Sequence, residues 1–343
     1  MARKKQSAGK VTLRDIAERA GVSPMTVSLS LRNDPSIPSK TRERIRALAE
    51  TMGYRKDPVV SELMTQLRAK HRSKGAAIAF VTDFDQPFGA LGAQHDIASL
   101  EGARQRAEAE GFALEEFQIN ARLSAARLEE ILWNRAIRGI LVGPLRQPDT
   151  RLDLALENAA AVAIGHTLRA PAVHRETNDH MQSMLLAVRR LREKGHRKIS
   201  ALLSGDADGR VSNRWRAGFL LARETLDIDP DSSYREPGGF ADMRSFGKWL
   251  REHRPDAIVT NRLDCIPAPA RQPWTASADD ASPTIALLHL ISARHAGFCG
   301  IDQRWSKLGS AAVGALTRQI YNHEYGVPED PYLIQIGGRW VDG

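Results

Sequence analysis

The chain has 343 residues, of which 42% are hydrophobic, and a formal net charge of +8 at pH 7. This length exceeds that of one ordinary domain and predicts two or three. Two cysteines, Cys265 and Cys299, are too few for a disulfide framework and lack metal-ligand spacing, so we expect reduced thiols. There is no run of about 18 apolar residues and no signal-peptide pattern, which argues against a membrane-bound or secreted protein.

The positive charge is concentrated at the amino-terminal end. Residues 1–74 hold 17 Lys and Arg against 7 Asp and Glu, a net charge of +10, whereas residues 75–343 have a net charge of −2. A basic module joined to a near-neutral body is typical of proteins that bind nucleic-acid phosphates. A uniformly basic chain would instead have indicated a general polyanion or membrane-surface binder.

Residues 12–32 predict two short helices joined by a tight turn. Thr12 and Asp15 form the capping-box pattern that precedes a helix, and the apolar residues that follow recur at helical spacing. Gly21 comes after the last turn of this helix. A glycine readily takes the left-handed conformation that ends a helix there.

The second helix is expected to follow Ser23, a preferred N-cap residue, with Pro24 at the first helical position. A third helix is expected over residues 39–52. Three such helices on a basic segment indicate a helix-turn-helix, whose second helix lies in the major groove of duplex DNA. The alternative is a small helical bundle with no nucleic-acid role.

A short amphipathic segment connects this module to the rest of the chain. It begins at Pro58, contains apolar residues as far as Leu67 and ends in a basic stretch. It is too short to be a stable helix alone, so we expect it to fold on DNA or against its copy in a dimer. The predicted division is a DNA-binding headpiece over 1–57, a hinge helix and linker over 58–75, and a two-lobed body over 76–343.

In the body, apolar runs of strand length alternate with amphipathic helical patterns, beginning with AAIAFVTDF. This alternation predicts an α/β fold with doubly wound parallel sheets and helices on both faces. About 260 residues would form two lobes, and a ligand would bind between the carboxyl ends of their strands. The proline-rich residues 262–283 predict a long irregular loop. The closing YLIQIGGRW is expected to return as a strand.

No catalytic or cofactor motif stands out. The P-loop, H-E-x-x-H, G-x-S-x-G and paired-cysteine patterns are all absent from the sequence. His166 and His289 follow predicted strands and could face a cleft, where a single histidine is more often a binding or structural group. The sequence therefore predicts no catalytic residue, no cofactor and no metal site.

The string VTLRDIAERAGVSPMTVSLSLRN, followed by KTRERIRALAETMGY, resembles the headpiece of the lactose-repressor/galactose-repressor (LacI/GalR) family of transcription regulators. The body is similar in the order of IRGILVGP, LREKGHRKISAL, WRAGF, DAIVTN and GRWVDG. The resemblance implies a headpiece, a hinge helix and a two-lobed domain like that of periplasmic sugar-binding proteins. It also implies a homodimer in the bacterial cytosol that binds near-palindromic operator DNA and a small effector, with no membrane partner.

The resemblance assigns DNA contacts to particular residues. The positions near phosphates or groove edges are Thr12, Leu13, Ser23, Thr26, Ser28 and Tyr54. Pro24 and Met25 occupy the two main base-reading positions. Leu29 stands where many members carry arginine and offers only apolar contact, so we expect a different operator preference. Leu63 matches the hinge leucine that family members insert into the minor groove, which kinks the duplex; its alternative role is dimer packing.

The resemblance also places an effector pocket between the lobes. Trp215 stands where members often carry a ligand-gripping arginine, and an indole can only stack or fill space. The neighbouring Arg214 and Arg216 are expected on other faces of the helix. Asn261 and Asp302 fall at ligand-binding positions, although Asp302 could instead cap a loop. The other wall candidates are Phe84, Asp85, Phe88 and His166. Polar groups beside an aromatic wall favour a neutral carbohydrate.

We therefore expect a sequence-specific transcription regulator, most simply a repressor, whose operator affinity changes when a sugar or sugar-like ligand binds. Three alternatives stay open. One is a regulator whose effector response is lost or not to a sugar, with Trp215 filling the pocket. Another is a cytosolic sugar-binding protein. The third is an enzyme acting on a sugar or nucleoside, for which Asp302 and Asp85 are the only acid/base candidates.

Overall fold

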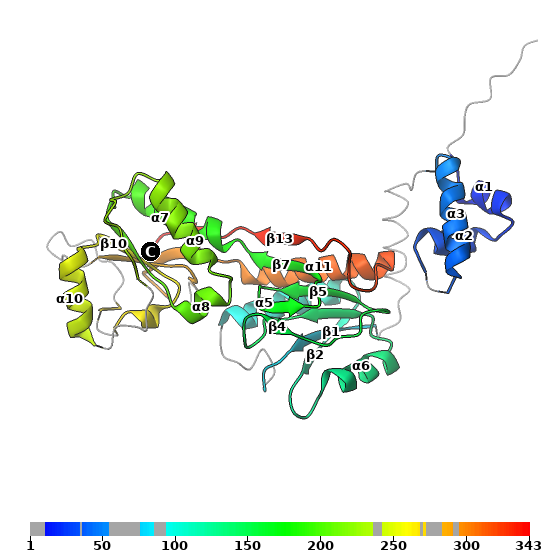
Figure 1. Ribbon diagram of the computed structural model, residues 1–343, viewed down its shortest axis with the longest axis horizontal. Coiled ribbons are helices and arrows are strands. Elements are labelled where there is room, and N and C mark those ends of the chain that lie inside the picture. The colour runs from blue at the N-terminus through cyan, green and yellow to red at the C-terminus, as the bar shows by residue number, and fades with distance from the viewer. Residues whose placement is uncertain are drawn as a thin grey trace, which may run out of the picture.

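The computed structural model describes residues 11–34, 36–54, 76–85, 94–235, 242–267, 270–271, 283–290 and 295–343. An amino-terminal helical module is followed by two α/β lobes (Figure 1). In this described part of the chain, none of the helices combines the length and apolarity that a bilayer crossing requires. Cys265 and Cys299 are both free and buried.

The amino-terminal module contains α1 (Leu13–Ala20), α2 (Pro24–Leu31) and α3 (Ser39–Thr51). The side chain of Thr12 accepts a hydrogen bond from Asp15 N, and Asp15 accepts one from Thr12 N. Gly21 ends α1 with φ of 69°. The capping box and the helix-ending glycine are thus confirmed. The core is a small apolar cluster made of Ile16, Ala17, Val27, Ile45 and Ala49.

The first lobe is built on a six-stranded sheet in the order β13-β7-β5-β3-β1-β2. All of its pairings are parallel. The strands are β1 (Ala77–Thr82), β2 (Ala113–Gln118), β3 (Gly139–Val142), β5 (Ala160–Ile164), β7 (His174–Asn178) and β13 (Leu333–Ile336). Helices α5 (Gln94–Ala109) and α11 (Trp305–Asn322) cover one face, and α6 (Ala125–Asn134) covers the other. A small ladder joins β4 (Thr150–Arg151) to β6 (Leu168–Ala170).

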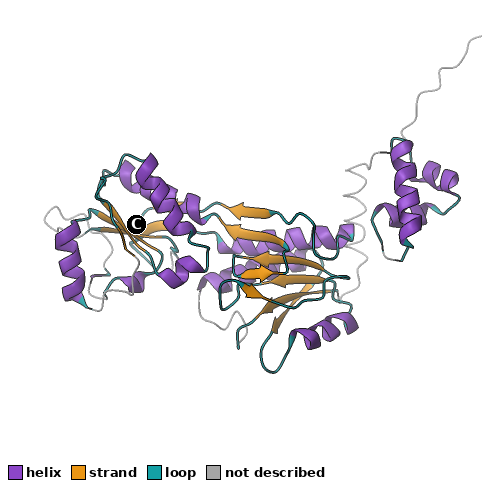
Figure 2. Cartoon of the chain, viewed as in Figure 1, coloured by secondary structure: helices purple, strands orange, loops and turns teal. Residues whose placement is uncertain are grey.

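The second lobe has the strand order β14-β12-β11-β10-β8-β9, in which only β14 is antiparallel to its neighbour. The strands are β8 (Ile199–Leu202), β9 (Tyr234–Arg235), β10 (Ala257–Thr260), β11 (Thr284–Leu287), β12 (Cys299–Asp302) and β14 (Arg339–Val341). Helices α7 (His180–Glu193) and α9 (Arg214–Thr225) pack on one face, and α10 (Met243–His253) packs on the other. Two short helices are α8 (Gly205–Gly209) and η2 (Leu263–Cys265). Figure 2 shows the helix layers around both sheets.

The predicted alternation of parallel strands and helices is confirmed, and so is the return of the chain's end as β13 and β14. The sequence pattern does not predict β7, because its residues HRETN form a polar run rather than an apolar one. This strand is nevertheless interior to the first sheet, between β5 and β13. Residues 268–269 and 272–282, most of the predicted loop, lie outside the described residues.

The chain crosses between the lobes three times, after β7, after β12 and between β13 and β14. Two hydrogen bonds join these crossings. Asn178 Nδ2 donates to Gln303 O over 2.6 Å, and Asp179 N donates to Ile336 O over 3.0 Å. The three crossing segments are therefore hydrogen-bonded to one another between the lobes.

Helices α5 and α11 approach each other closely because each has a glycine at the contact. A Cβ added to Gly102 would lie 2.0 Å from Ser306 O, and one added to Gly309 would lie 1.9 Å from Ser99 O. At its other end, α11 reaches the headpiece. His323 Nε2, after the last turn of α11, lies 3.4 Å from Asp34 Oδ2 in the α2–α3 turn.

Candidate functional site

The exposed face of α2 is the candidate DNA-reading surface. The side chain of Met25 is 65% exposed, whereas Val27 and Ser30 on the opposite face are fully buried. The hydroxyls of Ser23 and Thr26 lie 2.9 Å apart at the amino-terminal end of the helix. That end carries partial positive charge and free backbone N–H groups, which suits contact with a phosphate.

Other predicted DNA-contacting residues already have structural partners in the headpiece. The hydroxyl of Thr12 donates to Asp15 Oδ2, and Leu13 and Tyr54 pack against the apolar cluster. Ser28 Oγ accepts a hydrogen bond from Arg32 Nη2, and Arg32 Nε donates to Ser28 O. Arg32, which the sequence analysis did not single out, thereby places a cation at the end of α2.

Two more predicted DNA residues of α2 are surface residues of different exposure. Pro24 is exposed at the first helical position, and Leu29 is half-buried on the same helix. Leu63, the predicted minor-groove residue, lies outside the described residues.

A cavity of about 680 Å³ lies between the two lobes. It is lined from the first lobe by the ends of β5 and β7, and from the second by the segments after β8, β10 and β11. These are carboxyl ends of parallel strands, where ligands bind in open α/β sheets. The polar residues on its wall include His166, Asn178, His180, Asp206, Arg210, Asn261, Arg262, Asp264, Arg271 and His289.

A chain of five rings forms one side of the cavity. Successive ring centroids lie 5.9 Å apart for His166 and His180, 4.7 Å for His180 and Trp215, 5.4 Å for Trp215 and His289, and 5.8 Å for His289 and Trp305. Four of these residues line the cavity. The indole of Trp215 is fully buried in the core of the second lobe and lies behind them. It supports the wall rather than forming its surface.

Two histidines of this wall, His166 and His180, are held in the neutral form. Burial, together with the charges of Arg214 and Arg175, lowers the pKa of His166 to about 4. Burial also lowers the pKa of His180 well below its ordinary value, assisted by the neighbouring histidines and Arg214. Each neutral imidazole offers one hydrogen-bond donor and one acceptor. The Nε2 atom of His166 and the Nδ1 atom of His180 are buried with no hydrogen-bond partner among the described residues.

Some of the other residues predicted for the effector pocket line the cavity, and some lie elsewhere. His166 and Asn261 line the cavity, and the amide of Asn261 also joins it to the backbone, since its Oδ1 accepts from Ser204 N over 2.8 Å. Phe84 packs against the core of the first lobe. Asp85 is exposed and pairs with Arg146 over 3.2 Å. Phe88 lies outside the described residues.

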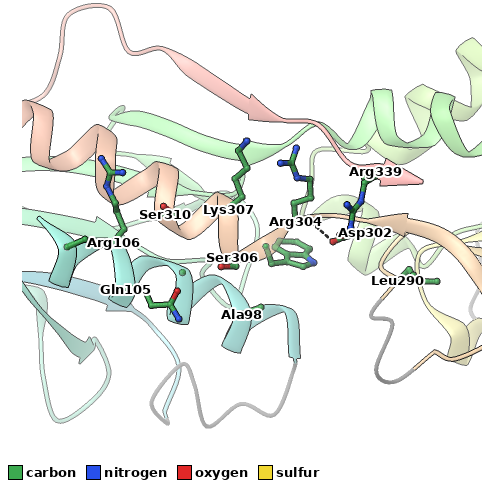
Figure 3. Close-up of a pocket in the computed structure, with 13 residues that line it drawn as sticks. Ala98, Gln105, Arg106, Leu290, Asp302, Arg304, Ser306, Lys307, Ser310 and Arg339 are labelled. Atoms are coloured by element: carbon green, nitrogen blue, oxygen red, sulfur yellow. Dashed lines mark hydrogen bonds and ion pairs between the residues drawn. The ribbon is translucent and has the colours of Figure 1, made fainter. Parts of the chain in front are cut away.

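Asp302 lines a second hollow, an open groove of about 840 Å³ beside α5 and the start of α11 (Figure 3). Its Oδ1 accepts a hydrogen bond from Arg304 N over 2.8 Å, and its Oδ2 lies 3.3 Å from Arg339. These are the contacts of a loop-capping residue, the alternative that the sequence analysis left open. The structure therefore does not bring Asp302 together with His166 and Asn261, nor with Asp85 as an acid/base pair.

The sequence pattern does not indicate several of the residues that line the cavity. Thr177, Asn178 and His180 come from the unrecognised strand β7 and the start of α7. Arg210 follows the short helix α8. By its polar sequence, β7 resembles a surface loop. In the structure, the residues at its carboxyl end are buried, and this burial distinguishes it from such a loop. Among the described residues there is no group of three or more side chains placed to hold a metal ion.

Comparison of the sequence with known proteins gives a match to a protein family and matches to individual relatives. Residues 12–57 match the family "Bacterial regulatory proteins, lacI family". The chain is 26% identical over 259 residues to the HTH-type transcriptional regulator MalR of Staphylococcus xylosus, covering 73% of each protein. It is 28% identical over 221 residues to the maltose regulon regulatory protein MalI of Escherichia coli (strain K12), covering 63% of this chain and 60% of that protein.

Solved structures share the fold over the full chain. The lac repressor dimer bound to operator and the anti-inducer ONPF has a TM-score of 0.52 at 18% identity, covering 97% of this chain and 98% of that one. The complex of the transcriptional regulator CelR with cellobiose has a TM-score of 0.54 at 17% identity, with the same coverage. The headpiece and the two lobes thus occur together in known proteins of this architecture.

Proposed function

Starting from the membership of this chain in the LacI family of DNA-binding transcription regulators, we propose that it is a homodimeric repressor of the bacterial cytosol. Residues 1–57 form its headpiece, 58–75 its hinge and 76–343 its effector-binding body. A small carbohydrate-like ligand in the interlobe cavity alters operator affinity. Because binding linkage is reciprocal, operator DNA changes ligand affinity by the same factor.

The observation that carries the DNA-binding part is the exposed face of α2. An exposed methionine at the start of a helix, on a segment with net charge +10, supports apolar base contact within a phosphate-binding surface. The other proposed contacts are Thr12, Leu13, Ser23, Pro24, Thr26, Ser28, Leu29, Tyr54 and Leu63. In a dimer, two such helices would enter successive major grooves, one helical turn apart.

The effector part is supported by the chemistry of the interlobe cavity. Its ring wall offers flat faces, and Asn261 with neutral His166 offers hydrogen bonds, an arrangement that suits a hydroxyl-rich ligand. CelR, a structural neighbour, is known in complex with cellobiose. We place the ligand of this chain in the interlobe cavity.

The test begins with selection of bound DNA from a random pool by the full-length protein. The selected site should contain two half-sites related by two-fold symmetry. Affinity for it should fall steeply as salt rises, since binding releases counterions. Recovery of no preferred sequence would refute the assignment.

A matched pair of variants then locates the reading surface. Met25→Ala should weaken binding to the selected site roughly tenfold, about the energy of one lost base contact. Met243→Ala, which removes another exposed methionine, on α10, should leave this affinity unchanged. Equal affinities of the two variants would contradict the proposed orientation of α2.

A further inference from the structure

Two adjacent strands of the first lobe place polar side chains at one end of the interlobe cavity. Ile164 of β5 pairs with Glu176 of β7, and Gly165 N donates to Glu176 O over 2.9 Å. His166 and Asn178, which come two residues further along, therefore follow the same end of neighbouring strands. Both line the cavity. Asn178 is only 1% exposed, and His166 is half-buried.

The side-chain amide of Asn178 uses its nitrogen and leaves its oxygen without a partner. Nδ2 donates to Gln303 O over 2.6 Å, and because only an NH₂ group can donate to a carbonyl, this contact fixes which way the amide points. Oδ1 is buried and has no hydrogen-bond partner among the described residues, and the same holds for His166 Nε2. Buried polar atoms without partners are unfavourable, so both call for a bonded group.

The loop that carries His166 is held from below by Arg175. Its guanidinium donates to Gly165 O over 2.5 Å and to Leu168 O over 2.7 Å, on either side of His166 in the sequence. Burial and the charges of Arg214 and Arg175 lower the pKa of the imidazole to about 4. His166 is therefore a fixed, uncharged ring that can donate through one nitrogen and accept through the other.

Gln303 continues the hydrogen bonds of Asn178 into the second lobe. It is fully buried on the crossing after β12, and its Nε2 donates to Leu288 O over 2.7 Å. Leu288 follows β11 and precedes His289, which lines the cavity. Two buried amides thus connect the end of β7 in the first lobe to the end of β11 in the second.

The charged residues that line the cavity all belong to the second lobe, and they are Asp206, Arg210, Arg262, Asp264 and Arg271. Arg262 and Asp264 pair with each other, and the charge of Asp206 also acts on Arg262. Among the described lining residues of the first lobe none carries a charge, since His166 is neutral. The end of the cavity at His166 and Asn178 is therefore polar but uncharged.

An ionised carboxylate has no proton to donate to Asn178 Oδ1, whereas a hydroxyl donates to one atom and accepts from another. We propose that the effector is an uncharged sugar with one hydroxyl donating to Asn178 Oδ1 and another bonded to His166 Nε2. Through Asn178 this sugar joins the amide network between the lobes, in which Gln303 is a positioning residue. The inference rests on the proposed function, because it takes the cavity as the effector site.

The first experiment compares neutral and charged sugars on the full-length protein. Thermal-shift and calorimetric measurements use D-glucose, maltose, cellobiose, trehalose and D-glucuronate at equal ionic strength. At least one neutral sugar should raise the Tm, and glucuronate should bind more weakly than the neutral sugar that binds best. The proposal is overturned if no neutral sugar binds, or if glucuronate binds as tightly as the best of them or more tightly.

Two substitutions of His166 test which ring atom binds the sugar. The amide of glutamine reaches the position of Nε2, whereas the shorter side chain of asparagine brings its amide only to the position of Nδ1. With the best-binding sugar, His166→Gln should keep the affinity within about threefold of the parent, and His166→Asn should weaken it about tenfold. Equal affinities, or the reverse order, would exclude His166 Nε2 as a ligand-binding atom.

Asn178→Leu removes the acceptor and nearly keeps the side-chain volume. It should weaken sugar binding about tenfold or more, because the hydroxyl loses its partner. Asn158→Leu, at an exposed position of the first lobe, is the control and should bind the sugar as the parent does. Equal affinities of these two variants would exclude Asn178 from the site. Since Asn178→Leu also loses the bond to Gln303 O, the His166 pair decides alone if this variant does not fold.

Gln303→Met tests the connection to the second lobe. Gln303 is not among the lining residues of the cavity, so sugar affinity measured without DNA should stay close to that of the parent. The loss of the bond to Leu288 O should instead bring the ratio of operator affinities with and without sugar closer to one. A ratio equal to that of the parent would remove Gln303 from the coupling between the lobes.

Operator binding by the parent separates this inference from the proposed function. If a sugar changes operator affinity and both His166 variants bind it as the parent does, the effector role stands and this binding mode is wrong. If a sugar binds through His166 and Asn178 without changing operator affinity, the binding mode stands and the effector role fails.

Discussion

The headpiece and the interlobe cavity differ in the sequence separation of the residues that they bring together. The buried cluster of the headpiece joins residues between Ile16 and Ala49, and its helix caps join residues three positions apart. The cavity joins residues between Pro144 and Leu308, carried by strands of two sheets. The headpiece is therefore specified by local pattern, whereas the cavity depends on how two distant sheets are assembled.

Trp215→Ala tests the largest expected difference between the two regions. The indole is fully buried in the second lobe, and truncating such a side chain costs about 3–5 kcal/mol. We expect a large fall in the Tm of the lobes, measured by calorimetry, with partial recovery in Trp215→Phe. Loss of ligand binding at unchanged Tm would show instead that Trp215 is a surface contact of the cavity.

Ile16→Ala applies the same change to the headpiece core. Ile16 is fully buried, so we expect about 2–5 kcal/mol of destabilisation. Operator binding should be lost, while the unfolding transition of the lobes stays in place. Glu50→Ala, at an exposed position of α3, is the control and should retain binding. A shift of the lobe transition by Ile16→Ala would show instead that the two regions unfold together.

Replacement of glycine by alanine is expected to have opposite effects on stability at two positions of α11. Gly309→Ala places a Cβ 1.9 Å from Ser99 O, so α5 and α11 must separate, at a cost of about 1–3 kcal/mol. In Gly314→Ala the nearest atom is 3.7 Å away on the flexible side chain of Arg106, and the gain in helix propensity is up to about 1 kcal/mol. Chemical denaturation should give a lower free energy of unfolding for Gly309→Ala than for the parent, and a higher one for Gly314→Ala.

Glu176 of β7 gives a prediction of pH dependence. The residue is 1% exposed, and burial raises the pKa of its carboxyl group to about 7. Because the folded pKa lies above the unfolded one, this group's contribution is fully present below about pH 4.5 and is lost as pH rises towards 7. The free energy of unfolding of the parent, relative to Glu176→Gln, should fall over that interval by at most about 1.4 kcal/mol per pH unit. If the free energies of unfolding of the parent and of Glu176→Gln changed with pH in parallel, the raised pKa of Glu176 would be refuted.

The smallest expected effect comes from removing one N-cap in each region. Ser23 caps α2 and Ser124 caps α6, each by accepting a bond from a backbone N–H three residues later. Replacing either serine by alanine should cost about 1 kcal/mol. The Ser23 variant should lower headpiece stability and weaken operator binding, and the Ser124 variant should affect only the lobes. Hydrogen exchange resolved by segment measures both.

The sequence alone determined the headpiece, the strand–helix alternation and the separation of a basic module from a neutral body. Those features depend on caps, periodicity and charge, which act over a few residues and can be recognised without a partner segment. Only the tertiary structure decided that polar β7 is an interior strand, that Trp215 lies behind the cavity wall, and that Asp302 belongs to a different hollow from His166. Each of these depends on which strands become neighbours across two sheets, and that pairing is set by contacts between residues far apart in the chain.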